Sequence, residues 1–355
     1  MPDQGDSATR LGLIGAGLIG ARHAQLIQDD PDIVLVAIAD PSDAARAIAR
    51  QHSVAHYDDF RSLIEREALD GVVVAAPNQL HGQIGLACIE RGLPLLVEKP
   101  IADTFEAGAA LVAAAESRGL PLLVGHHRRF HAMVEATQAM LAAGEIGELV
   151  AVSAMWATRK PDHYFEAAPW RRAEGGGPVL INLIHDIDCL RHFAGEIEEV
   201  HAIASNARRD FAVEDAAVAV LRFAGGALGT ITLTDCAPSP WSWEAGSGEN
   251  PGIAGTGQNC YRFLGTRGSL DFPNLVLWRQ EGTSAWDWSL PLQPREFPRR
   301  ANVPLAAQLK HFRHVIRGEE PARVSGREGL ATLAATLAIN ESACLGRPVR
   351  PRTLG

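Results

Sequence analysis

The stretch RLGLIGAGLIG, residues 10–20, decides the predicted fold of this chain. Its first half is apolar and predicts a short buried strand, and its second half has the spacing G-x-G-x-x-G, which predicts a tight turn into a helix. Gly15 permits the turn, Gly17 lets the backbone approach a pyrophosphate, and Gly20 permits close packing of helix and strand. The free N–H groups at the start of such a helix favour an anion. A glycine turn and helix cap without a ligand is the alternative interpretation.

Asp40 supports the nucleotide interpretation, because it lies 20 residues beyond Gly20 at the end of a second apolar run. A carboxylate at this place accepts hydrogen bonds from the hydroxyls of an adenosine ribose. It would repel a 2′-phosphate, and no arginine follows it directly, so the sequence predicts NAD and makes NADP the less favoured cofactor. The first group of expected cofactor contacts is Gly15, Gly17, Leu18, Ile19, Gly20 and Asp40.

The first 125 residues alternate short apolar runs with helical patterns. Wholly apolar strands between helices are typical of a parallel sheet that is buried on both faces. Right-handed crossovers then give a doubly wound α/β fold of the Rossmann type. We expect residues 1–125 to form a nucleotide-binding domain.

The pattern changes after residue 126. Longer strand-like runs cover about residues 149–157, 198–205, 216–223 and 227–234, and Gly225-Gly226 between the last two is a hairpin signal. Helical patterns cover about residues 178–193, 305–317 and 326–345. We expect residues 126–355 to form a second α/β domain with an open, mostly antiparallel sheet.

Composition limits the classes of partner and compartment. The 355 residues are 46% hydrophobic and 21% charged, which is ordinary for a globular protein. The net charge of −9 makes nucleic acid and anionic membrane unfavourable partners. Five scattered cysteines without a C-x-x-C motif predict free thiols in a reducing compartment. No signal peptide or long apolar span is recognisable, so a cytoplasmic protein is expected.

Glu98-Lys99-Pro100 follows another apolar run, at residues 93–97. Ligands of doubly wound sheets bind beyond the carboxyl ends of the strands, so Lys99 is expected near the nicotinamide end of a bound dinucleotide. A partly desolvated lysine beside a cationic ring has a lowered pKa, which suits it to acid–base chemistry. An exposed lysine paired with Glu98 is the simpler alternative.

These motifs together resemble the Gfo/Idh/MocA family of NAD(P)-dependent oxidoreductases. The resemblance extends over nearly the whole chain, about residues 10–349. The matching features are Gly15 to Gly20, Ala76-Pro77-Asn78 with His81, Glu98-Lys99-Pro100, Arg128-Arg129-Phe130, Gly175 to Gly177, His185 with Asp188, Val324-Ser325-Gly326 and Gly346-Arg347-Pro348-Val349.

The resemblance implies roles for individual residues. It implies a second group of cofactor contacts, which are Ala76, Pro77, Asn78, His81, Glu98 and Lys99. It implies that Lys99 is catalytic and that His185 is its partner in proton transfer. It further implies a sugar, an inositol or a related polyol, or its keto form, as the substrate. The open sheet of the second domain often mediates assembly in this family, which implies a homodimer or homotetramer.

One departure from the family pattern concerns the residue four positions before His185, which is commonly Asp and is Ile181 here. Asn182 follows it and is expected to hydrogen-bond the substrate instead. Residues three and four apart share a helix face, so Asn182, His185, Asp186, Asp188 and Cys189 are expected around one patch.

Further residues are expected at the substrate. His126 ends a predicted strand at the ligand-binding edge of the sheet. Trp170 is suited to stack on a sugar ring and Arg171 to contact phosphate or hydroxyls, although a loop anchor explains both equally well. The complete expected substrate-binding set is Lys99, His126, Arg128, Trp170, Arg171, Asn182, His185 and Asp188.

Other histidines and tryptophans have simpler interpretations. His52 and His56 have the spacing H-x-x-x-H without the accompanying ligands of a metal site, so no metal is expected. Residues 237–257 are rich in Pro, Gly and Ser and predict a long loop. Its Trp241 and Trp243 either cover a sugar face or fix the loop by burial, and for at least one of them burial is favoured.

The sequence therefore predicts a dehydrogenase or reductase that transfers a hydride between nicotinamide and a secondary alcohol or ketone of a sugar, an inositol or a related polyol. Two alternatives stay open. One is an NAD-using enzyme on the same scaffold that cleaves a glycoside. The other is an NAD-binding regulator without catalytic activity.

Overall fold

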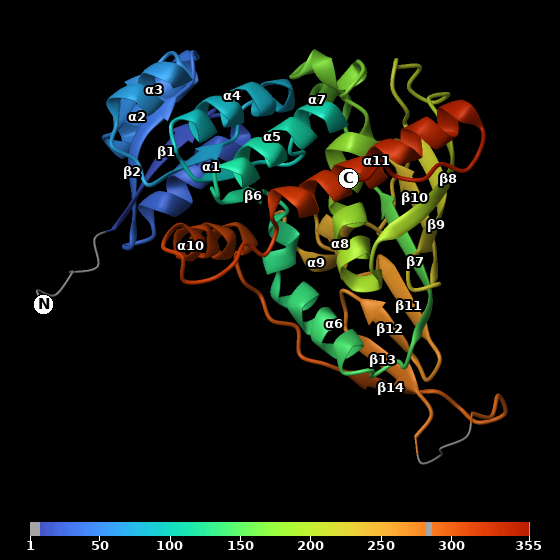
Figure 1. Ribbon diagram of the computed structural model, residues 1–355. Coiled ribbons are helices and arrows are strands. Elements are labelled where there is room, and N and C mark those ends of the chain that lie inside the picture. Colours follow the sequence, from blue (N-terminus) through green and yellow to red (C-terminus); the bar gives the residue numbers. More distant parts are fainter. Residues whose placement is uncertain (1–7, 282–285, 355) are drawn as a thin grey trace, which may run out of the picture. The chain divides into compact units, whose positions relative to one another are not determined.

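The computed structural model describes residues 8–281 and 286–354, which divide into two units (Figure 1). Unit 1 contains the described chain up to Phe130 together with Val303–Leu333 and Leu354. Unit 2 contains His131–Asn302 and Ala334–Thr353. Among the described residues, no helix is both long and apolar enough to cross a membrane.

Unit 1 is built on a six-stranded parallel sheet in the order β3-β2-β1-β4-β5-β6. The strands are β1 (Thr9–Ile14), β2 (Ile33–Ala39), β3 (Ala55–Tyr57), β4 (Gly71–Val74), β5 (Leu95–Val97) and β6 (Leu122–Val124). The order reverses beside β1, which makes the ends of β1 and β4 the switch point where doubly wound sheets bind ligands. The expected Rossmann architecture is confirmed.

Short polar side chains cap some of the helices of unit 1 but not all of them. The helices are α1 (Leu18–Gln28), α2 (Asp43–His52), α3 (Phe60–Arg66), α4 (Asn78–Glu90), α5 (Phe105–Ser117) and α10 (Pro304–Ile316). Ser42, Asp59 and Thr104 accept hydrogen bonds from the backbone three residues further on. By contrast, Gly17 precedes α1 without any side-chain cap, which leaves the first N–H groups of α1 uncapped by a side chain.

The division into units differs from the expected boundary. Residues 126–355 were expected to form one domain, but residues 126–130, Val303–Leu333 and Leu354 belong to unit 1, and Val303–Leu333 is the main difference. The reason is the apolar face of α10, on which Leu305, Leu309 and Phe312 are buried in the same core as the β1 side chains. The spacing of these residues predicts a buried face, but it does not say which core buries it.

Unit 2 is built on an eight-stranded sheet in the order β14-β13-β12-β11-β7-β10-β9-β8. The strands are β7 (Leu149–Ala157), β8 (Ile197–Ser205), β9 (Ala216–Phe223), β10 (Leu228–Thr234), β11 (Tyr261–Gly265), β12 (Ser269–Phe272), β13 (Val276–Arg279) and β14 (Gln293–Glu296). Strands β7 and β10 are parallel, and the other neighbouring strands are antiparallel. This confirms the expected mostly antiparallel sheet.

The helical elements that remain are mostly in unit 2. They are a 3₁₀ turn (His127–Phe130), α6 (Ala132–Ala142), α7 (Asp162–Glu166), a second 3₁₀ turn (Pro169–Arg172), a π-helical turn (Val179–Leu183), α8 (Ile184–Ala194), α9 (Trp243–Ser247) and α11 (Gly326–Leu345). The first 3₁₀ turn belongs to unit 1, and α11 begins in unit 1 and ends in unit 2.

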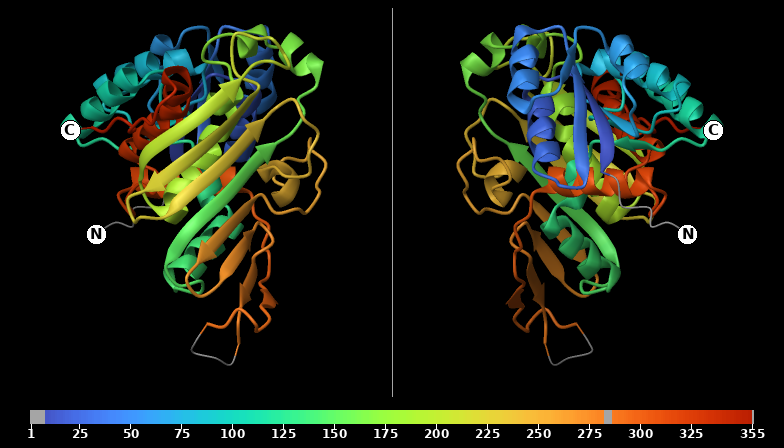
Figure 2. Two further views of the ribbon diagram at one scale, coloured as in Figure 1. Left: turned by 90° about the vertical axis from the view of Figure 1, so that its right-hand side faces the viewer. Right: turned by 90° about the vertical axis from the view of Figure 1, so that its left-hand side faces the viewer.

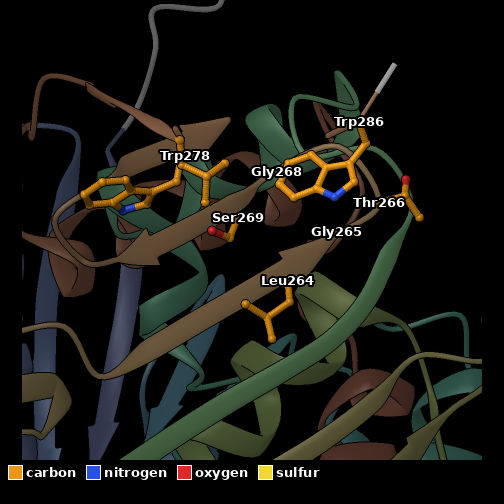
Figure 3. Close-up of a pocket in the computed structure, with 8 residues that line it drawn as sticks. Leu264, Gly265, Thr266, Gly268, Ser269, Trp278 and Trp286 are labelled. Atoms are coloured by element: carbon orange, nitrogen blue, oxygen red, sulfur yellow. The ribbon is translucent and has the colours of Figure 1, made fainter. Parts of the chain in front are cut away.

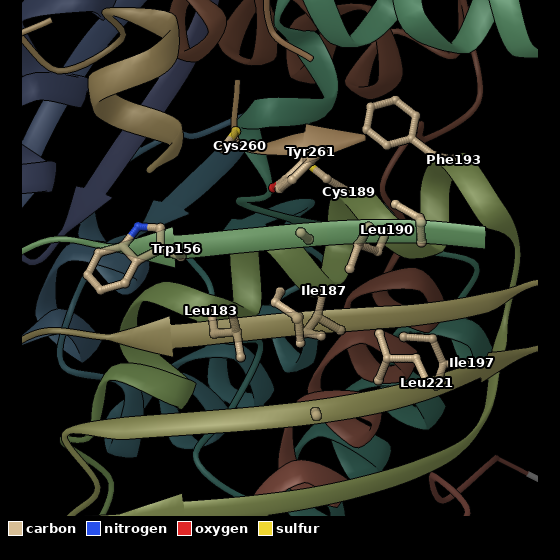
Figure 4. Close-up of a cluster of buried hydrophobic side chains, with 14 of the residues drawn as sticks. Trp156, Leu183, Ile187, Cys189, Leu190, Phe193, Ile197, Leu221, Cys260 and Tyr261 are labelled. Atoms are coloured by element: carbon tan, nitrogen blue, oxygen red, sulfur yellow. The ribbon is translucent and has the colours of Figure 1, made fainter. Parts of the chain in front are cut away.

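Helix α8 covers one face of the unit 2 sheet. Leu183, Ile187 and Leu190 pack with Leu221 of β9 in one buried cluster (Figure 4). The sheet strands alternate buried and exposed side chains, so their other side points away from this core. The left view in Figure 2 shows this broad face of β7, β8, β9 and β10.

Two surface pockets lie within single units and contain none of the predicted site residues. One has a volume of about 340 Å³ and lies at the outer part of the unit 2 sheet, where Trp278 and Trp286 line it (Figure 3). The other has a volume of about 230 Å³ and lies in unit 1 beside α5, with Glu116 and Arg327 in its lining.

Candidate active site

The glycine loop of unit 1 has the geometry that a bound dinucleotide needs. Gly15 has φ +89°, and a Cβ there would lie 2.5 Å from Ala76 N, so no side chain fits. A Cβ on Gly20 would lie 2.1 Å from the carbonyl oxygen of Gly15. A Cβ on Gly17, in contrast, would meet no atom within 4 Å. The loop is thus closely packed on its inner side and open at Gly17, where a pyrophosphate would approach the start of α1.

Leu18 and Ile19 occupy the first positions of α1 with exposed side chains. They can offer a ligand their backbone N–H groups, because the first N–H groups of a helix have no acceptor within the helix.

Asp40 follows β2, and its carboxylate is fixed by the backbone. Oδ2 accepts a hydrogen bond from Ala16 N and Oδ1 accepts one from Ser42 N, both at 2.9 Å. Burial alone would raise the pKa of Asp40, but these hydrogen bonds outweigh it and lower the pKa. The carboxylate is therefore ionised at neutral pH, and each oxygen keeps accepting capacity for a ribose hydroxyl. Its contact with Ala16 also ties it to the glycine loop.

Ala76, Pro77 and Asn78 connect β4 to α4, which begins at Asn78. His81, one turn into α4, is buried, and its ring joins this loop to the segment after β5. Nδ1 lies 2.8 Å from the carbonyl oxygen of Pro100, and Nε2 lies 2.8 Å from that of Ala76. Burial lowers the pKa of His81 against the opposing effect of both carbonyls, so the neutral ring donates to one of them. His81 thus positions the loop around Lys99 from within the core.

Glu98 anchors the segment that carries Lys99. Its Oε1 lies 2.8 Å from Nε2 of His23 on α1, and its Oε2 accepts a hydrogen bond from Lys99 N at 3.2 Å. Burial would raise the pKa of Glu98, but the hydrogen bond from His23 and the positive charges of His23, His127 and Lys99 lower it to about 2. The buried carboxylate is ionised, and it links the cofactor helix to the half-buried Lys99.

The 3₁₀ turn after β6 anchors the returning segment of unit 1. His126 and Arg128 are buried. Arg129 pairs with Glu328 at 3.0 Å, and Arg323 lies over the ring of Phe130 at 4.6 Å. Arg129 and Phe130 therefore hold Val303–Leu333 in place, whereas His126 and Arg128 stay candidates for substrate contact.

Two further predicted site residues lie at the start of α8 in unit 2. Asn182 lies in the π-helical turn and His185 lies in the first turn of α8, both half-buried. Asn182 Oδ1 accepts a hydrogen bond of 2.7 Å from Nζ of Lys160, a residue that the sequence analysis did not single out. The only sequence signal for Lys160 is its polar side chain shortly after a long apolar strand.

The expected patch on α8 is smaller than predicted. Asp186 accepts a hydrogen bond from the hydroxyl of Tyr261, and Cys189 belongs to the hydrophobic core with Tyr261 (Figure 4). Asp186 and Cys189 therefore face the core of unit 2, and Asp188 is fully buried. Helix α8 is buried over most of its circumference, so an i, i+4 spacing alone does not show which of its polar side chains face the core.

The aromatic candidates divide into anchors and exposed rings. Arg171 stacks on Tyr164 at 3.7 Å and donates a hydrogen bond to its carbonyl oxygen, so it anchors the loop that contains it. Trp170 stays half-exposed and available to a ligand. Trp243 is fully buried in α9 and packs on Phe272 at 4.9 Å, which confirms that burial fixes this loop, whereas Trp241 is exposed.

The site fits an organic cofactor in unit 1. Its glycine cradle, uncapped helix start and fixed carboxylate match the phosphates and ribose of a dinucleotide. In the described parts of the chain, no three His, Cys, Asp or Glu side chains are arranged to hold a metal ion.

Comparison with known families gives two consecutive matches. Residues 9–126 match the GFO_IDH_MocA family, described as "Oxidoreductase family, NAD-binding Rossmann fold". Residues 134–271 match the "GFO/IDH/MocA C-terminal domain". These segments contain the predicted site residues except Arg128, which lies between the two matches.

Comparison with individual proteins agrees with the family matches. The chain is 31% identical to the rhizopine catabolism protein MocA of Rhizobium meliloti over 53% of this chain, and the match spans only 57% of that relative. It is 28% identical to 1,5-anhydro-D-fructose reductase of Ensifer adhaerens, over 97% of this chain and 99% of the relative. The WlbA dehydrogenase of Bordetella pertussis, solved in complex with NADH and UDP-GlcNAcA, has a TM-score of 0.77 and 25% identity, with 98% of this chain and all of that chain covered.

Proposed function

Because the chain belongs to the Gfo/Idh/MocA family of oxidoreductases, we propose that it is an NAD-dependent dehydrogenase or reductase of a sugar, an inositol or a related polyol. The reaction interconverts a secondary alcohol and its ketone. The observation that carries the proposal is the open cradle at Gly17 beside a carboxylate fixed at Asp40. Two similar proteins support the substrate class. One is named 1,5-anhydro-D-fructose reductase, and the other is the WlbA dehydrogenase solved with NADH and UDP-GlcNAcA.

The cofactor is held by unit 1. The backbone from Gly15 to Gly20 binds the pyrophosphate, and Asp40 binds the adenosine ribose through its two oxygens. A fixed, ionised carboxylate at this position favours NAD over NADP, because it repels a 2′-phosphate. A dinucleotide held by these residues would supply hydride transfer to or from the substrate carbon.

Lys99 and His185 manage the proton at the substrate oxygen. In the oxidising direction His185 takes the hydroxyl proton, and Lys99 polarises the same oxygen as the carbonyl forms. In the reducing direction the proton returns to that oxygen. Groups in these roles contribute about 10²–10⁴-fold to rate. Glu98 and His81 support Lys99 by fixing the segment on either side of it.

The test is a panel of sugars, inositols and their keto forms, followed at the absorbance band of NADH with NAD and with NADP. We expect turnover with NAD for part of this panel. Substrate consumption without net change in NADH would instead indicate cleavage of a glycoside through transient oxidation. NAD binding without any conversion would indicate a regulator.

We further propose that the chain forms a homodimer or homotetramer through the open face of the unit 2 sheet. This proposal is supported by large apolar side chains that are exposed on β8, β9 and β10, which are Ile203, Val218, Val220 and Leu228. A contiguous apolar patch of this kind is unfavourable in water and is typical of an interface.

A further inference from the structure

A polar cluster in unit 2 is not used by the function proposed above. Lys160 follows β7 and Asp235 follows β10, and these two strands are parallel neighbours whose paired residues end at Ala157 and Thr234. The main chain joins the two residues directly, because Lys160 N donates to the carbonyl oxygen of Asp235 at 2.9 Å. Both side chains are therefore fixed at the carboxyl ends of a parallel strand pair.

Lysine is rare in this chain, which makes its burial at position 160 informative. Only Lys99, Lys160 and Lys310 are lysines among the 33 basic residues, so arginine supplies the remaining positive charge. An ammonium is more compact than a guanidinium and gives up its proton more readily when buried. Position 160 thus carries the basic side chain that this sequence otherwise avoids.

The Lys160 ammonium is enclosed by specific partners. Its Nζ donates to Asn182 Oδ1 at 2.7 Å and lies 3.6 Å from Asp235 Oδ2. The rings of Trp156 and Tyr164 lie under it at 5.6 and 4.9 Å. Burial lowers the pKa of Lys160 to about 8, against the attraction of Asp235.

Arg209 holds Asp235 independently of Lys160. Its Nε donates to Asp235 Oδ1 at 2.9 Å, and its Nη2 donates to the carbonyl oxygens of Lys160 and Asp235 at 2.8 and 2.6 Å. Arg209 therefore pairs with the Asp235 carboxylate at short range. The Lys160 ammonium lies farther from this carboxylate, and its shortest polar contact is the hydrogen bond to Asn182.

This contact decides which end of the Asn182 amide faces a ligand. A primary amide has an acceptor oxygen and a donor nitrogen. Reversing it would bring its NH₂ group against the NH₃⁺ group of Lys160, so Oδ1 stays on Lys160. Within the described part of the chain, Nδ2 of Asn182 has no partner. Asn182 lies three residues before His185, so the free donor belongs to the segment that carries the proton-transfer group.

We propose that Lys160 and Asn182 determine substrate specificity. Lys160 fixes Asn182 so that Nδ2 of Asn182 donates a hydrogen bond to an acceptor oxygen of the substrate. This oxygen belongs to a keto, carboxylate or ring-ether group next to the reacting carbon. A hydroxyl that has to donate at this place finds no acceptor on Asn182. The inference rests on the proposed function, which supplies the reaction. It adds which kind of group the substrate carries next to the reacting carbon.

The contact itself is tested by lysine titration in the full-length protein with NAD bound. Protein labelled with ¹⁵N and ¹³C in lysine gives three side-chain signals, which Lys160→Met and Lys310→Arg assign. We expect Lys160 to titrate near pH 8, and Asn182→Asp to raise its pKa by about one unit or more, because a carboxylate then faces the ammonium. The other charged groups near Lys160 are unchanged in this variant; they are Asp235, Arg209, Arg171 and Glu214.

Specificity is tested with matched ligand pairs in the NAD-loaded enzyme. The pairs are D-glucitol with 1,5-anhydro-D-glucitol, and D-glucitol with D-gluconate, so that both members of each pair carry a secondary alcohol that NAD can oxidise. We expect Asn182→Asp to change the ratio of KM values within a pair by about tenfold or more against the acceptor-bearing member, with a smaller change in kcat. Lys160→Met abolishes the preference, Lys160→Arg restores part of it, and Lys310→Met, on the exposed face of α10, leaves it unchanged.

The outcomes separate the two proposals. Equal ratios in the wild type, Asn182→Asp and Lys160→Met overturn the inference, and so does a Lys160 titration that Asn182→Asp leaves unchanged. If the wild type converts no compound of the panel, the proposed function fails. In that case calorimetry gives the ratio of the dissociation constants within each pair for the NAD-loaded protein. An equal ratio in the wild type, Asn182→Asp and Lys160→Met then overturns the inference.

Discussion

Lys99 is the residue on which the proposed chemistry depends most directly. Its main chain is fixed by the Glu98 carboxylate, so truncating its side chain leaves the fold of this segment in place. We expect Lys99→Ala to reduce kcat by about 10²–10⁴-fold, because the positioned proton donor is lost. NAD affinity, measured by fluorescence titration, should change by less than about threefold, since the glycine loop and Asp40 are untouched.

Lys310→Ala is the matched control for that experiment, because it removes an exposed ammonium from α10. Near-normal turnover in Lys99→Ala would contradict the assigned role.

Asp40 determines the choice between the two cofactors. We expect Asp40→Ala to weaken NAD binding and to reduce the discrimination against NADP, both by about tenfold, which is the value of one or two hydrogen bonds to a charged group. Because its pKa is lowered by Ala16 and Ser42, the contribution of Asp40 to NAD affinity is constant at neutral pH and is lost only as the pH falls through that lowered pKa. A wild type that prefers NADP would contradict this assignment.

At the residue scale, the sequence was sufficient where geometry requires one residue type. Gly15 and Gly20 have no room for a Cβ, and such positions produce a recognisable spacing. Lys160 gave no such signal, because its importance comes from partners on β10 and in the π-helical turn that are distant in sequence. Helix spacing placed Asp186 and Cys189 with His185, but their partners in the core of unit 2 lie on other elements and are not visible in the periodicity.

At the scale of elements, the buried pair between His23 on α1 and Glu98 after β5 joins the cofactor helix to the catalytic segment. The folded-state pKa of Glu98, about 2, lies below its ordinary value, so its contribution to stability is present above the ordinary pKa and lost as the pH falls towards 2. We expect His23→Leu to cost about 3–5 kcal/mol at pH 7, because it leaves a buried carboxylate without its partner.

That prediction is checked by urea denaturation of the wild type and the variant between pH 4 and 8. The penalty should shrink towards pH 4, where the unpaired carboxyl group is protonated. A second variant, His23→Gln, keeps a donor near Glu98 and should recover part of the loss. A penalty that does not depend on pH would contradict the assigned role of the pair.

Elements with a continuous apolar run were predictable, and elements formed by tertiary contact were not. The strands of unit 1 apart from β3 follow from apolar runs that are mostly buried. Strand β3 has only three partly exposed residues and exists because it pairs with β2. Strands β11 to β13 likewise extend the unit 2 sheet from segments of four or five residues, which are too short for a clear pattern, and the polar β14 (QPRE) resembles a loop in composition.

At the scale of the whole molecule, the division into units shows what a linear pattern omits. The chain leaves unit 1 after Phe130 and returns to it at Val303. The core of unit 1 is therefore complete only when α10 packs against it. Unit 1 therefore depends on a segment more than 170 residues away in sequence. A truncation at residue 125 would expose the apolar side chains that α10 covers.

The assembly proposed for the open sheet face gives the last prediction. Val218 and Val220 lie on the exposed side of β9 with about half of each surface accessible, and Ile203 of β8 is 75% exposed. An isologous contact buries the same patch on two copies, so a single substitution acts twice in a dimer. We expect Val218→Glu with Val220→Glu to convert a dimer or tetramer into smaller species, measured by light scattering after size-exclusion chromatography.

The matched control is Val34→Glu, which places the same charge on an exposed position of β2 in unit 1. NAD binding should persist in the β9 variant, because the cofactor residues belong to unit 1 and the substituted residues to unit 2. A monomeric wild type, or an unchanged mass in the double variant, would show that another surface or no surface carries the assembly. Because a buried glutamate is costly on both copies at once, a true interface on this face would not tolerate the pair of substitutions.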